Sequence, residues 1–276
     1  MLNDPNSKEL KFLSNDEIRE VAPTVFTEKP AENVSKHYTH IPTVQVLDDM
    51  KKLGWGVVDA QQVKARKNST IGFQKHLVTF RNPDVVINGE DGDTVFPQIL
   101  LTNSHDGKNA FTFTAGLFRL VCSNGLVIAD KKFNDVKMRH MGYTFEDLQV
   151  QIKEMVEQLP LTVESMNKMK GIELNKKQMK SLAKKALTTR FTKDQLKVTK
   201  IDLDELINPV RDEDKGNDLW SVFNVIQEKI IDGDFDYMSG ARIRKARQVK
   251  NFKQDMDINK KLFEMATELI PEEIAS

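Results

Sequence analysis

Two short segments rich in lysine and arginine have the residue types and the spacing that a phosphate-bearing ligand requires. The first, 176–190, is predicted as a helix with lysines on one face, and the second, 242–250, carries five cations. Binding to a polyanion needs several cations on one surface, because each neutralised phosphate releases bound counterions. The alternative is that these cations only keep exposed faces soluble. The predicted nucleic-acid contacts are Lys177, Lys180, Lys184, Arg190, Arg242, Arg244, Lys245 and Arg247.

Three aromatic residues flank the two basic segments. Phe191 directly follows the first, while Tyr237 precedes the second and Phe252 follows it. An aromatic ring can stack on an unpaired base, which favours a single-stranded nucleic acid as the ligand. The alternative interpretation places all three rings in the hydrophobic core.

Two patterns of histidine and aspartate resemble metal-binding motifs, but both are incomplete. His37 and His40 have HxxH spacing without an accompanying group of Glu, Asp or Cys. Residues 232–236 begin like a calcium loop with three aspartates, yet Tyr237 stands where glycine is needed and Ile243 where a bidentate glutamate is needed. An exposed acidic turn explains the aspartates better. We therefore predict no metal and no other cofactor.

The signatures of common catalytic sites are absent from the sequence. It contains no GxxxxGK[ST] phosphate loop, no GxGxxG motif after a strand and no GxSxG elbow. Cys122 is the single cysteine, and its apolar surroundings in sequence favour a small buried thiol over a nucleophile. The sequence thus predicts a protein that is not an enzyme.

Composition excludes several other classes of protein. The 276 residues include 41 Lys and Arg against 41 Asp and Glu, so the chain as a whole is neither histone-like nor acidic. No apolar run approaches the roughly 18 residues of a membrane-spanning helix. The first residues lack the basic and apolar regions of a secretory signal. We expect a cytoplasmic globular protein without a membrane partner.

The neutral total conceals a strong local asymmetry. Residues 131–200 contain 16 Lys and Arg against 8 Asp and Glu, whereas residues 201–240 contain 3 against 11. Three interpretations remain open: the basic block binds a polyanion, the acidic block covers it in the same or a neighbouring subunit, or both are solvated faces. Opposite patches on identical chains favour head-to-tail contacts, so we expect a homo-oligomer.

Hydrophobic periodicity divides the chain into three parts and predicts an α+β fold. Residues 1–35 are expected to form a polar N-terminal arm with one short helix at Asn15–Val21. Residues 36–143 are expected to form an antiparallel sheet with long hairpins and one packing helix. Residues 144–276 are expected to form a helical region that contains the basic and acidic blocks.

Three local features are predicted within the sheet region. Thr43 is expected to cap a helix that ends at Gly54. Asp106-Gly107 is expected to form a two-residue hairpin turn. A bulge is expected at Gly116, because Arg119 otherwise falls on the apolar face of its strand.

The helical region is predicted from apolar residues repeated at helical spacing. The helix that follows Thr144 is expected to end at Pro160, and a second helix to begin after Leu161. Further helices are expected at 175–191, 218–231 and 255–269. Trp220 and Phe223 are the largest apolar residues of the fourth helix and should be buried.

Three stretches of sequence resemble one family. FRLVCSNGLVI (118–128), GNDLWSVFNVIQEKII (216–231) and RKARQVKNFKQDMDINKKLFEMA (244–266) are similar to the phage/plasmid-like proteins that share domain of unknown function 932. The resemblance covers residues 30–270 and implies a mobile-element protein acting on or near DNA metabolism, without assigned catalytic residues. Asn224 and Glu228 match polar positions of the family motif. We interpret them as a hydrogen-bonded pair on one helix.

The order of elements is also similar, at the level of fold alone, to single-strand-annealing recombinases, which form rings with a basic groove. Three hypotheses follow. The first is a non-catalytic protein that binds or anneals single-stranded DNA in recombination or replication. The second is a protein-interaction module, such as an inhibitor of a host defence system. The third, an enzyme, has only the acidic clusters in its favour, and we prefer the first.

Overall fold

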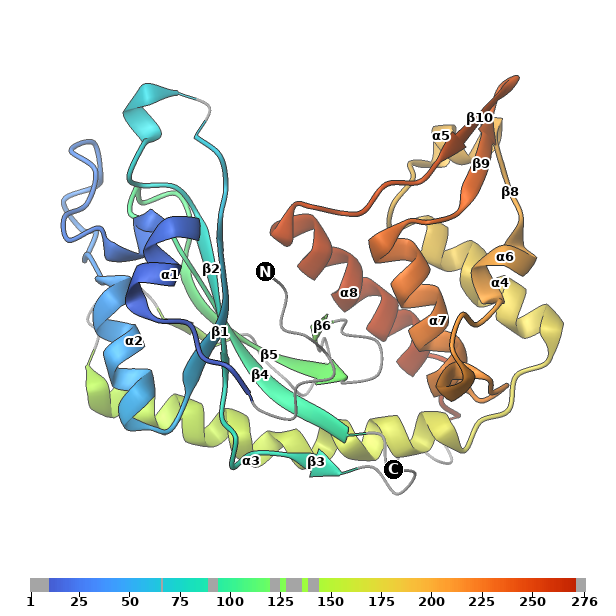
Figure 1. Ribbon diagram of the computed structural model, residues 1–276, viewed down its shortest axis with the longest axis horizontal. Helices are drawn as coiled ribbons and strands as arrows, with labels where there is room; N and C mark the ends of the chain where they lie inside the picture. Colours follow the sequence, from blue (N-terminus) through green and yellow to red (C-terminus); the bar gives the residue numbers. More distant parts are fainter. Residues whose placement is uncertain are drawn as a thin grey trace. The chain divides into compact units, whose positions relative to one another are not determined.

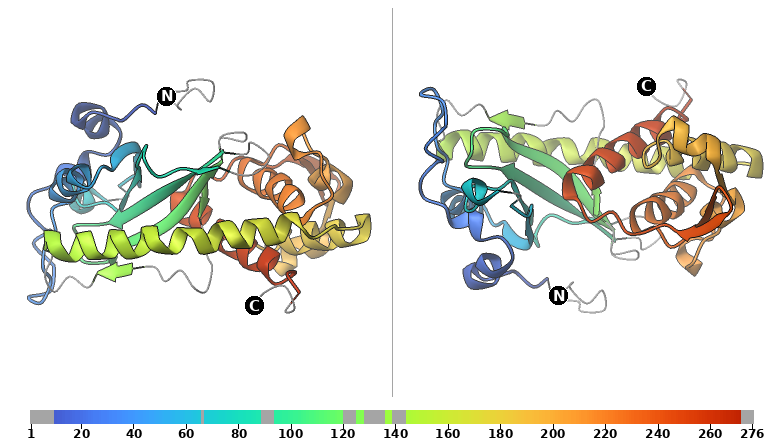
Figure 2. Two further views of the ribbon diagram at one scale, coloured as in Figure 1. Left: turned by 90° about the horizontal axis from the view of Figure 1, so that it is seen from below. Right: turned by 90° about the horizontal axis from the view of Figure 1, so that it is seen from above.

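The computed structural model describes residues 10–65, 67–88, 94–119, 125–127, 136–138 and 144–271. Within these ranges the chain forms two compact units. Figure 1 labels the elements, and Figures 1 and 2 colour them along the sequence. The first unit contains residues up to 126 together with 136–159, and the second contains Val127 and residues 160–271. Strands dominate the first unit and helices the second, which confirms the predicted α+β class.

An antiparallel sheet forms the framework of the first unit. Its four long strands lie in the order β1, β2, β4, β5, with bounds Gly56–Gln62, His76–Arg81, Thr94–Asn103 and Phe111–Arg119. Short strands extend this framework: β3 (Ile87–Asn88) pairs with β4, whereas β6 (Gly125–Val127) and β7 (Val136–Met138) lie beside β5. The sequence therefore predicted the sheet and its hairpin connectivity correctly.

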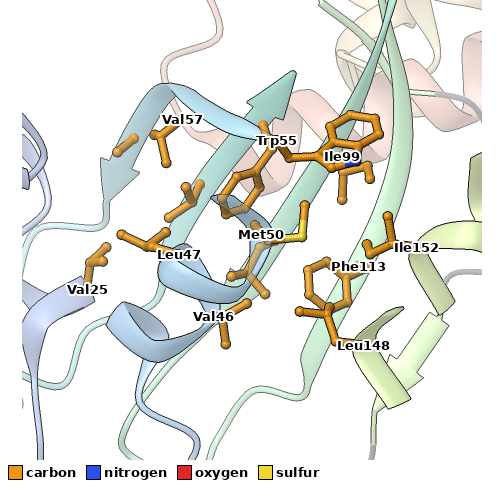
Figure 3. Packing of buried hydrophobic residues seen from close by; sticks show 14 of the residues in the cluster. Val25, Val46, Leu47, Met50, Trp55, Val57, Ile99, Phe113, Leu148 and Ile152 are labelled. Carbon is orange, nitrogen blue, oxygen red and sulfur yellow. The ribbon is translucent and has the colours of Figure 1, made fainter. Parts of the chain in front are cut away.

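Helices cover one face of this sheet and enclose the core of the first unit. They are α1 (Asn15–Val21), the 3-10 turn η1 (Pro23–Phe26), α2 (Thr43–Lys52) and the first half of α3 (Phe145–Lys170). Figure 3 shows Leu47 and Met50 of α2 and Ile152 of α3 converging on Ile99 and Phe113 of the sheet, and all five are at most 4% exposed. This burial anchors both helices, because removing apolar area from water is the main stabilising contribution to folding.

Two sequence predictions, for the start of α2 and for the strand β5, were wrong in detail. Thr43 is the first residue of α2 and Pro42 is its N-cap, while the Thr43 hydroxyl bonds to His76 Nε2 at 2.8 Å. Gly116 pairs with Gln98 in an unbroken register, so it forms no bulge. Arg119 is the last residue of β5, and the apolar alternation therefore needs no correction inside the strand.

The hairpin between β4 and β5 also differs from the prediction. The connection spans residues 104–110 and is not a two-residue turn, although Gly107 does adopt a positive φ of 71°. The longer loop is held by its own side chains and by the arm: Ser104 Oγ donates to Asp106 Oδ1 at 2.7 Å, and His105 Nε2 lies 3.0 Å from Thr24 O. Such contacts were not visible in the local sequence.

The helix α3 continues through Pro160, where the sequence predicts an end. It runs over 26 residues, and the border between the two units falls inside it, between residues 159 and 160. A proline removes one intrahelical hydrogen bond and crowds the preceding turn, but it does not have to end a helix. Buried residues on both sides, Met155 before the proline and Met166 and Met169 after it, hold the helix in place.

The second unit is a cluster of helices with one small sheet. Its helices are α4 (Lys176–Leu187), α5 (Lys193–Val198), α6 (Leu203–Ile207), α7 (Leu219–Asp232) and α8 (Phe252–Thr267), with the 3-10 turn η3 (Asp212–Asp214). Trp220 and Phe223 of α7 are each 2% exposed, which confirms that they are buried. Their rings lie 5.9 Å apart, and the ring of Phe223 meets Phe263 of α8 edge-on at 6.1 Å.

Candidate nucleic-acid interface

The first four residues of the second basic segment form the edge strand of a three-stranded antiparallel sheet. The strands β8 (Thr199–Ile201), β9 (Asp236–Ser239) and β10 (Arg242–Lys245) lie in the order β10, β9, β8. We call this the small sheet. A tight turn at Gly240, with a φ of 62°, joins β9 to β10, and the resulting hairpin extends away from α7 (Figure 1). The pairing of β9 with β10 determines on which face of the small sheet each side chain of the hairpin lies.

One face of the small sheet carries the arginines together with an aromatic ring. Arg244 pairs with Tyr237, and Arg242 pairs with Ser239. Residues that pair directly across antiparallel strands lie on the same face, so both arginines share a face with Tyr237. The ring of Phe191 meets Tyr237 edge-on at 5.4 Å. We call this the arginine face of the small sheet.

The opposite face carries two exposed aliphatic side chains among the charged residues Lys200, Asp236 and Lys245. Ile243 pairs with Met238, and Met238 pairs with Lys200 of β8. Ile243 is 72% exposed and Met238 41% exposed, although both are large aliphatic residues. Lys245 forms an ion pair with Asp234 at 2.6 Å. The pair raises the pKa of Lys245 and lowers the pKa of Asp234, which favours the charged form of both side chains. The charge of Lys245 is therefore largely compensated.

Arg190 acts within the fold, at the junction between α4 and the base of the hairpin. Its guanidinium donates to Ile230 O at 2.5 Å and to Arg247 O, and it lies over the ring of Phe235 at 5.8 Å. Burial lowers the pKa of Arg190. These contacts tie the end of α4 to the end of α7 and to the chain after β10. A positioning role therefore fits Arg190 better than a phosphate contact.

Four of the five lysines of α4 divide into two groups. Lys176 and Lys180 both bind Asp204 of α6, at 2.8 and 2.6 Å, and these hydrogen bonds lower the pKa of Asp204. Lys177 and Lys184 are exposed, and no ion pair involves them in the described part of the chain. The acidic block thus meets the basic block inside one chain at Asp204, as one of the three interpretations expected.

Five of the eight predicted contacts therefore present exposed cations without a hydrogen bond or ion pair from the side chain to any residue that the structure describes. They are Lys177, Lys184, Arg242, Arg244 and Arg247. Lys180 and Lys245 are ion-paired, and Arg190 is bonded to two carbonyl groups. The contact between Phe191 and Tyr237 joins the end of α4 to the small sheet, so the two basic segments are in contact through these rings.

The polar residues of the family motif serve the interior of the second unit. Glu228 accepts a hydrogen bond from Arg211, which also donates to Asp214 Oδ2 at 2.9 Å. Asn224 donates to Trp220 O at 2.8 Å. The predicted pair between Asn224 and Glu228 was therefore wrong, because each side chain has a partner elsewhere among the described residues. Both roles are structural.

A second polar network connects α7 to α8 and was not predicted. Gln227 donates to Asn259 Oδ1 at 2.8 Å, and Asn259 donates to Asp255 Oδ1 at 2.7 Å. Burial, and after it the nearby charge of Asp232, raises the pKa of Asp255 to about 6. Gln227 is 2% exposed and Asn259 is 1% exposed. In the sequence, the only indication of this burial is that both residues have apolar neighbours.

Three histidines form a polar cluster in the first unit, and two of them, His76 and His105, are fully buried. The rings of His40 and His76 lie 4.7 and 5.1 Å from that of His105. His76 Nδ1 is 3.1 Å from Gln74 O, which can only accept, so Nδ1 carries the proton and Nε2 accepts from Thr43. Burial lowers the pKa of His76 to about 4. The cluster draws on three distant positions, so no local motif could have revealed it.

The described residues contain no group of three or more His, Cys, Asp or Glu side chains arranged to hold a metal ion. His37 of the HxxH pattern is exposed, whereas His40 contacts His105. Asp234 binds Lys245 and Asp232 accepts from Gln248 at 3.3 Å, so these two carboxylates have other partners. Cys122 lies outside the described residues.

The fold and the site define an α+β protein with exposed, unpaired cations on helix α4 and on the small sheet. The chain belongs to the family described as domain of unknown function (DUF932), whose model matches residues 30–263. It is 32% identical over 259 residues to UPF0380 protein YafZ of Escherichia coli (strain K12), covering 94% of this chain and 92% of that protein. It is also 32% identical over 260 residues to UPF0380 protein YfjQ of the same strain, with the same coverage.

No solved structure matches this chain. The fold-level similarity to annealing recombinases therefore stays a prediction. Among the described helices, none has the length and apolar character that crossing a membrane requires.

Proposed function

We propose that this protein is a non-catalytic, cytoplasmic nucleic-acid-binding protein of a phage or plasmid, which binds or anneals single-stranded DNA in recombination or replication. The arginine face of the small sheet carries the proposal. It places Arg242 and Arg244 beside Tyr237, and the exposed Arg247 follows the same strand. Arginines bind phosphates and an aromatic ring stacks on an unpaired base, which is the combination that single-strand-binding surfaces use.

Helix α4 supplies the second part of the proposed surface. Lys177 and Lys184 are seven residues apart, so they project from the same side of the helix two turns from each other. Arg190 holds the end of this helix against the base of the hairpin through its bond to Arg247 O. Arg190 therefore connects the helix that carries Lys177 and Lys184 to the chain that follows the arginine face.

The family supports the mobile-element context and leaves the ligand open. The phage- and plasmid-like resemblance favours a role in the DNA metabolism of a mobile element. The names of the relatives YafZ and YfjQ state no ligand and no activity. The proposal therefore depends on the charges and rings of the second unit.

A salt series with labelled oligonucleotides tests the proposal. If five cations contact phosphates, the logarithm of the affinity for single strands should fall against the logarithm of salt concentration with a slope of about −3 to −4. Arg242→Glu combined with Arg244→Glu should weaken binding at least about tenfold, because two contacts become repulsive. The duplex of the same sequence should bind less tightly, since its bases cannot stack on Tyr237.

The matched control changes the same number of charges in the first unit. Lys64→Glu combined with Lys67→Glu replaces two exposed lysines outside the proposed surface and should leave the affinity unchanged. Equal losses in the two double variants would mean that only overall charge matters. No binding of micromolar protein at about 50 mM salt would contradict the proposed function.

A homo-oligomer and a host-protein partner are further parts of this proposal. The head-to-tail arrangement was predicted from the opposite charge blocks, and Asp204 shows that part of this charge is compensated within one chain. Light scattering at low and high salt tests the assembly. A single mass near 31.6 kDa under all conditions would contradict the oligomer and the ring. A protein-interaction module, such as an inhibitor of a host defence system, is the alternative function.

A further inference from the structure

The outer edge of the small sheet is available for another strand. The strand β10 pairs with β9 on one side, and no strand among the described residues pairs with its other side. All four residues of β10 are exposed. In an antiparallel pair, alternate residues direct their N–H and C=O groups away from the partner strand, so β10 presents a row of unused backbone donors and acceptors.

The side chains of β10 define what an added strand would meet. Arg242 and Arg244 project from the arginine face, while Ile243 lies on the opposite face next to Met238. Lys245 is already paired with Asp234. An added strand would therefore place side chains opposite two arginines on one face and opposite an exposed isoleucine on the other. Acidic and aliphatic side chains in alternation match this pattern.

The same charges exclude a second copy of β10 from this edge. Three of its four residues are cationic, so two such strands side by side would bring like charges directly opposite each other. The other edge strand, β8, offers Lys200 and no carboxylate. Charged residues on an edge are a common protection against self-pairing, and here they leave the edge open to a strand of opposite charge.

We propose that the outer edge of β10 binds an extended acidic segment of another protein, in which glutamate or aspartate alternates with aliphatic residues, as a fourth strand of the small sheet. Main-chain hydrogen bonds would supply much of the affinity, and the alternating side chains would supply the specificity. This interaction goes beyond the proposed nucleic-acid binding and does not depend on it, because Ile243 and the backbone edge take no part in phosphate contacts.

The test uses the full-length protein and a labelled synthetic peptide with the core Glu-Val-Glu-Val-Glu. Fluorescence anisotropy should show saturable binding that the Lys-Val-Lys-Val-Lys peptide does not reproduce. Methylation of alternate backbone nitrogens of the acidic peptide should abolish binding, because it removes the donors that pair with β10. Ile243→Asp should weaken the acidic peptide at least about tenfold, through repulsion of its glutamates and loss of the aliphatic contact.

The matched control is Val210→Asp, which places the same charge at a 70% exposed aliphatic position of the second unit, outside the small sheet. It should leave peptide binding unchanged. Ile243→Thr keeps a branched residue suited to a strand and should bind with intermediate affinity. Circular dichroism and thermal melting of each variant confirm that the second unit is folded.

Three outcomes would overturn this proposal. The first is that Ile243→Asp binds the peptide as well as the unchanged protein does, and the second is that Val210→Asp loses as much peptide affinity as Ile243→Asp. The third is that the protein alone forms an oligomer that Ile243→Asp dissociates, which would make a second copy the occupant. Ile243→Asp should still bind the oligonucleotide, which separates the two proposals.

For the unchanged protein, binding of the peptide but not of the oligonucleotide would contradict the proposed function alone. Binding of the oligonucleotide but not of the peptide would contradict the added strand alone.

Discussion

The two sheets of this protein differ in the burial of their polar residues. In the large sheet of the first unit, all six residues of β2 are buried, and its polar end at His76 is bonded to Thr43. In the small sheet of the second unit, all four residues of β10 are exposed, and two arginines have no partner in the described chain. Polar groups that are satisfied inside a fold specify its structure, whereas exposed unpaired charges are available to a ligand.

The same contrast appears in the ionisable groups of the two units. The first unit keeps a buried histidine neutral, and burial lowers the pKa of His76 to about 4. The second unit buries a carboxyl group, and this burial, followed by the nearby charge of Asp232, raises the pKa of Asp255 to about 6. Acidification therefore acts on the two units with opposite sign, and each unit contains one buried tryptophan that can report on it, Trp55 and Trp220.

The largest expected effect tests whether the apolar face of α7 belongs to the interior. Phe223→Ala should lower the free energy of unfolding by about 3–5 kcal/mol, because it leaves a cavity beside Trp220 and Phe263. Denaturant titration followed by Trp220 fluorescence measures it. The exposed Val210→Ala is the control and should change stability by less than about 0.5 kcal/mol. A loss below about 1 kcal/mol for Phe223→Ala would make this face a partner-binding surface.

The second prediction tests the histidine cluster through pH. Below pH 6.5 the unfolded chain binds a proton at His76 that the folded chain accepts only near pH 4, so the stability of the first unit should fall by about 3 kcal/mol between these values. For Asp255 the folded chain keeps a proton that the unfolded chain releases above pH 3.8, so acidification from pH 6 should stabilise the second unit. Denaturant titrations at several pH values, in variants that retain only Trp55 or only Trp220, measure both slopes.

Two substitutions assign these slopes to their residues. His76→Asn should flatten the pH dependence reported by Trp55, and Asp255→Asn should flatten the one reported by Trp220. Parallel slopes in both reporters of the unchanged protein would show that neither group dominates the acid response of its unit.

The smallest expected effect compares two lysines on one helix. Lys180 is paired with Asp204, so Lys180→Ala should cost at most about 1 kcal/mol of stability and little affinity for oligonucleotides. Lys184 is exposed, so Lys184→Ala should leave stability unchanged and should reduce the salt slope for single strands by about 0.7. Equal effects on binding would contradict the division of α4 into paired and free lysines.

The sequence by itself determined the long strands of the large sheet and the main helices, but it did not predict the small sheet of β8, β9 and β10. Alternating and helical apolar spacing is set by neighbours along the chain, so the strands around Val78 and Phe113 and the buried stripe with Trp220 and Phe223 were predictable. The positions of the basic segments were predictable for the same reason. The end of α3 was not, because residues buried on both sides of Pro160 continue the helix that a local rule would stop.

Only the tertiary structure decided which predicted cations remain free. Asp204 pairs with Lys180, and Arg190 is bonded to the carbonyl of Ile230, 40 positions away in the chain. The sequence also assigned both Arg244 and Ile243 to one basic segment, whereas the strand pairing separates them onto opposite faces. Residue type fixes the charge of a side chain, but its partners depend on segments that only folding brings within a few ångströms.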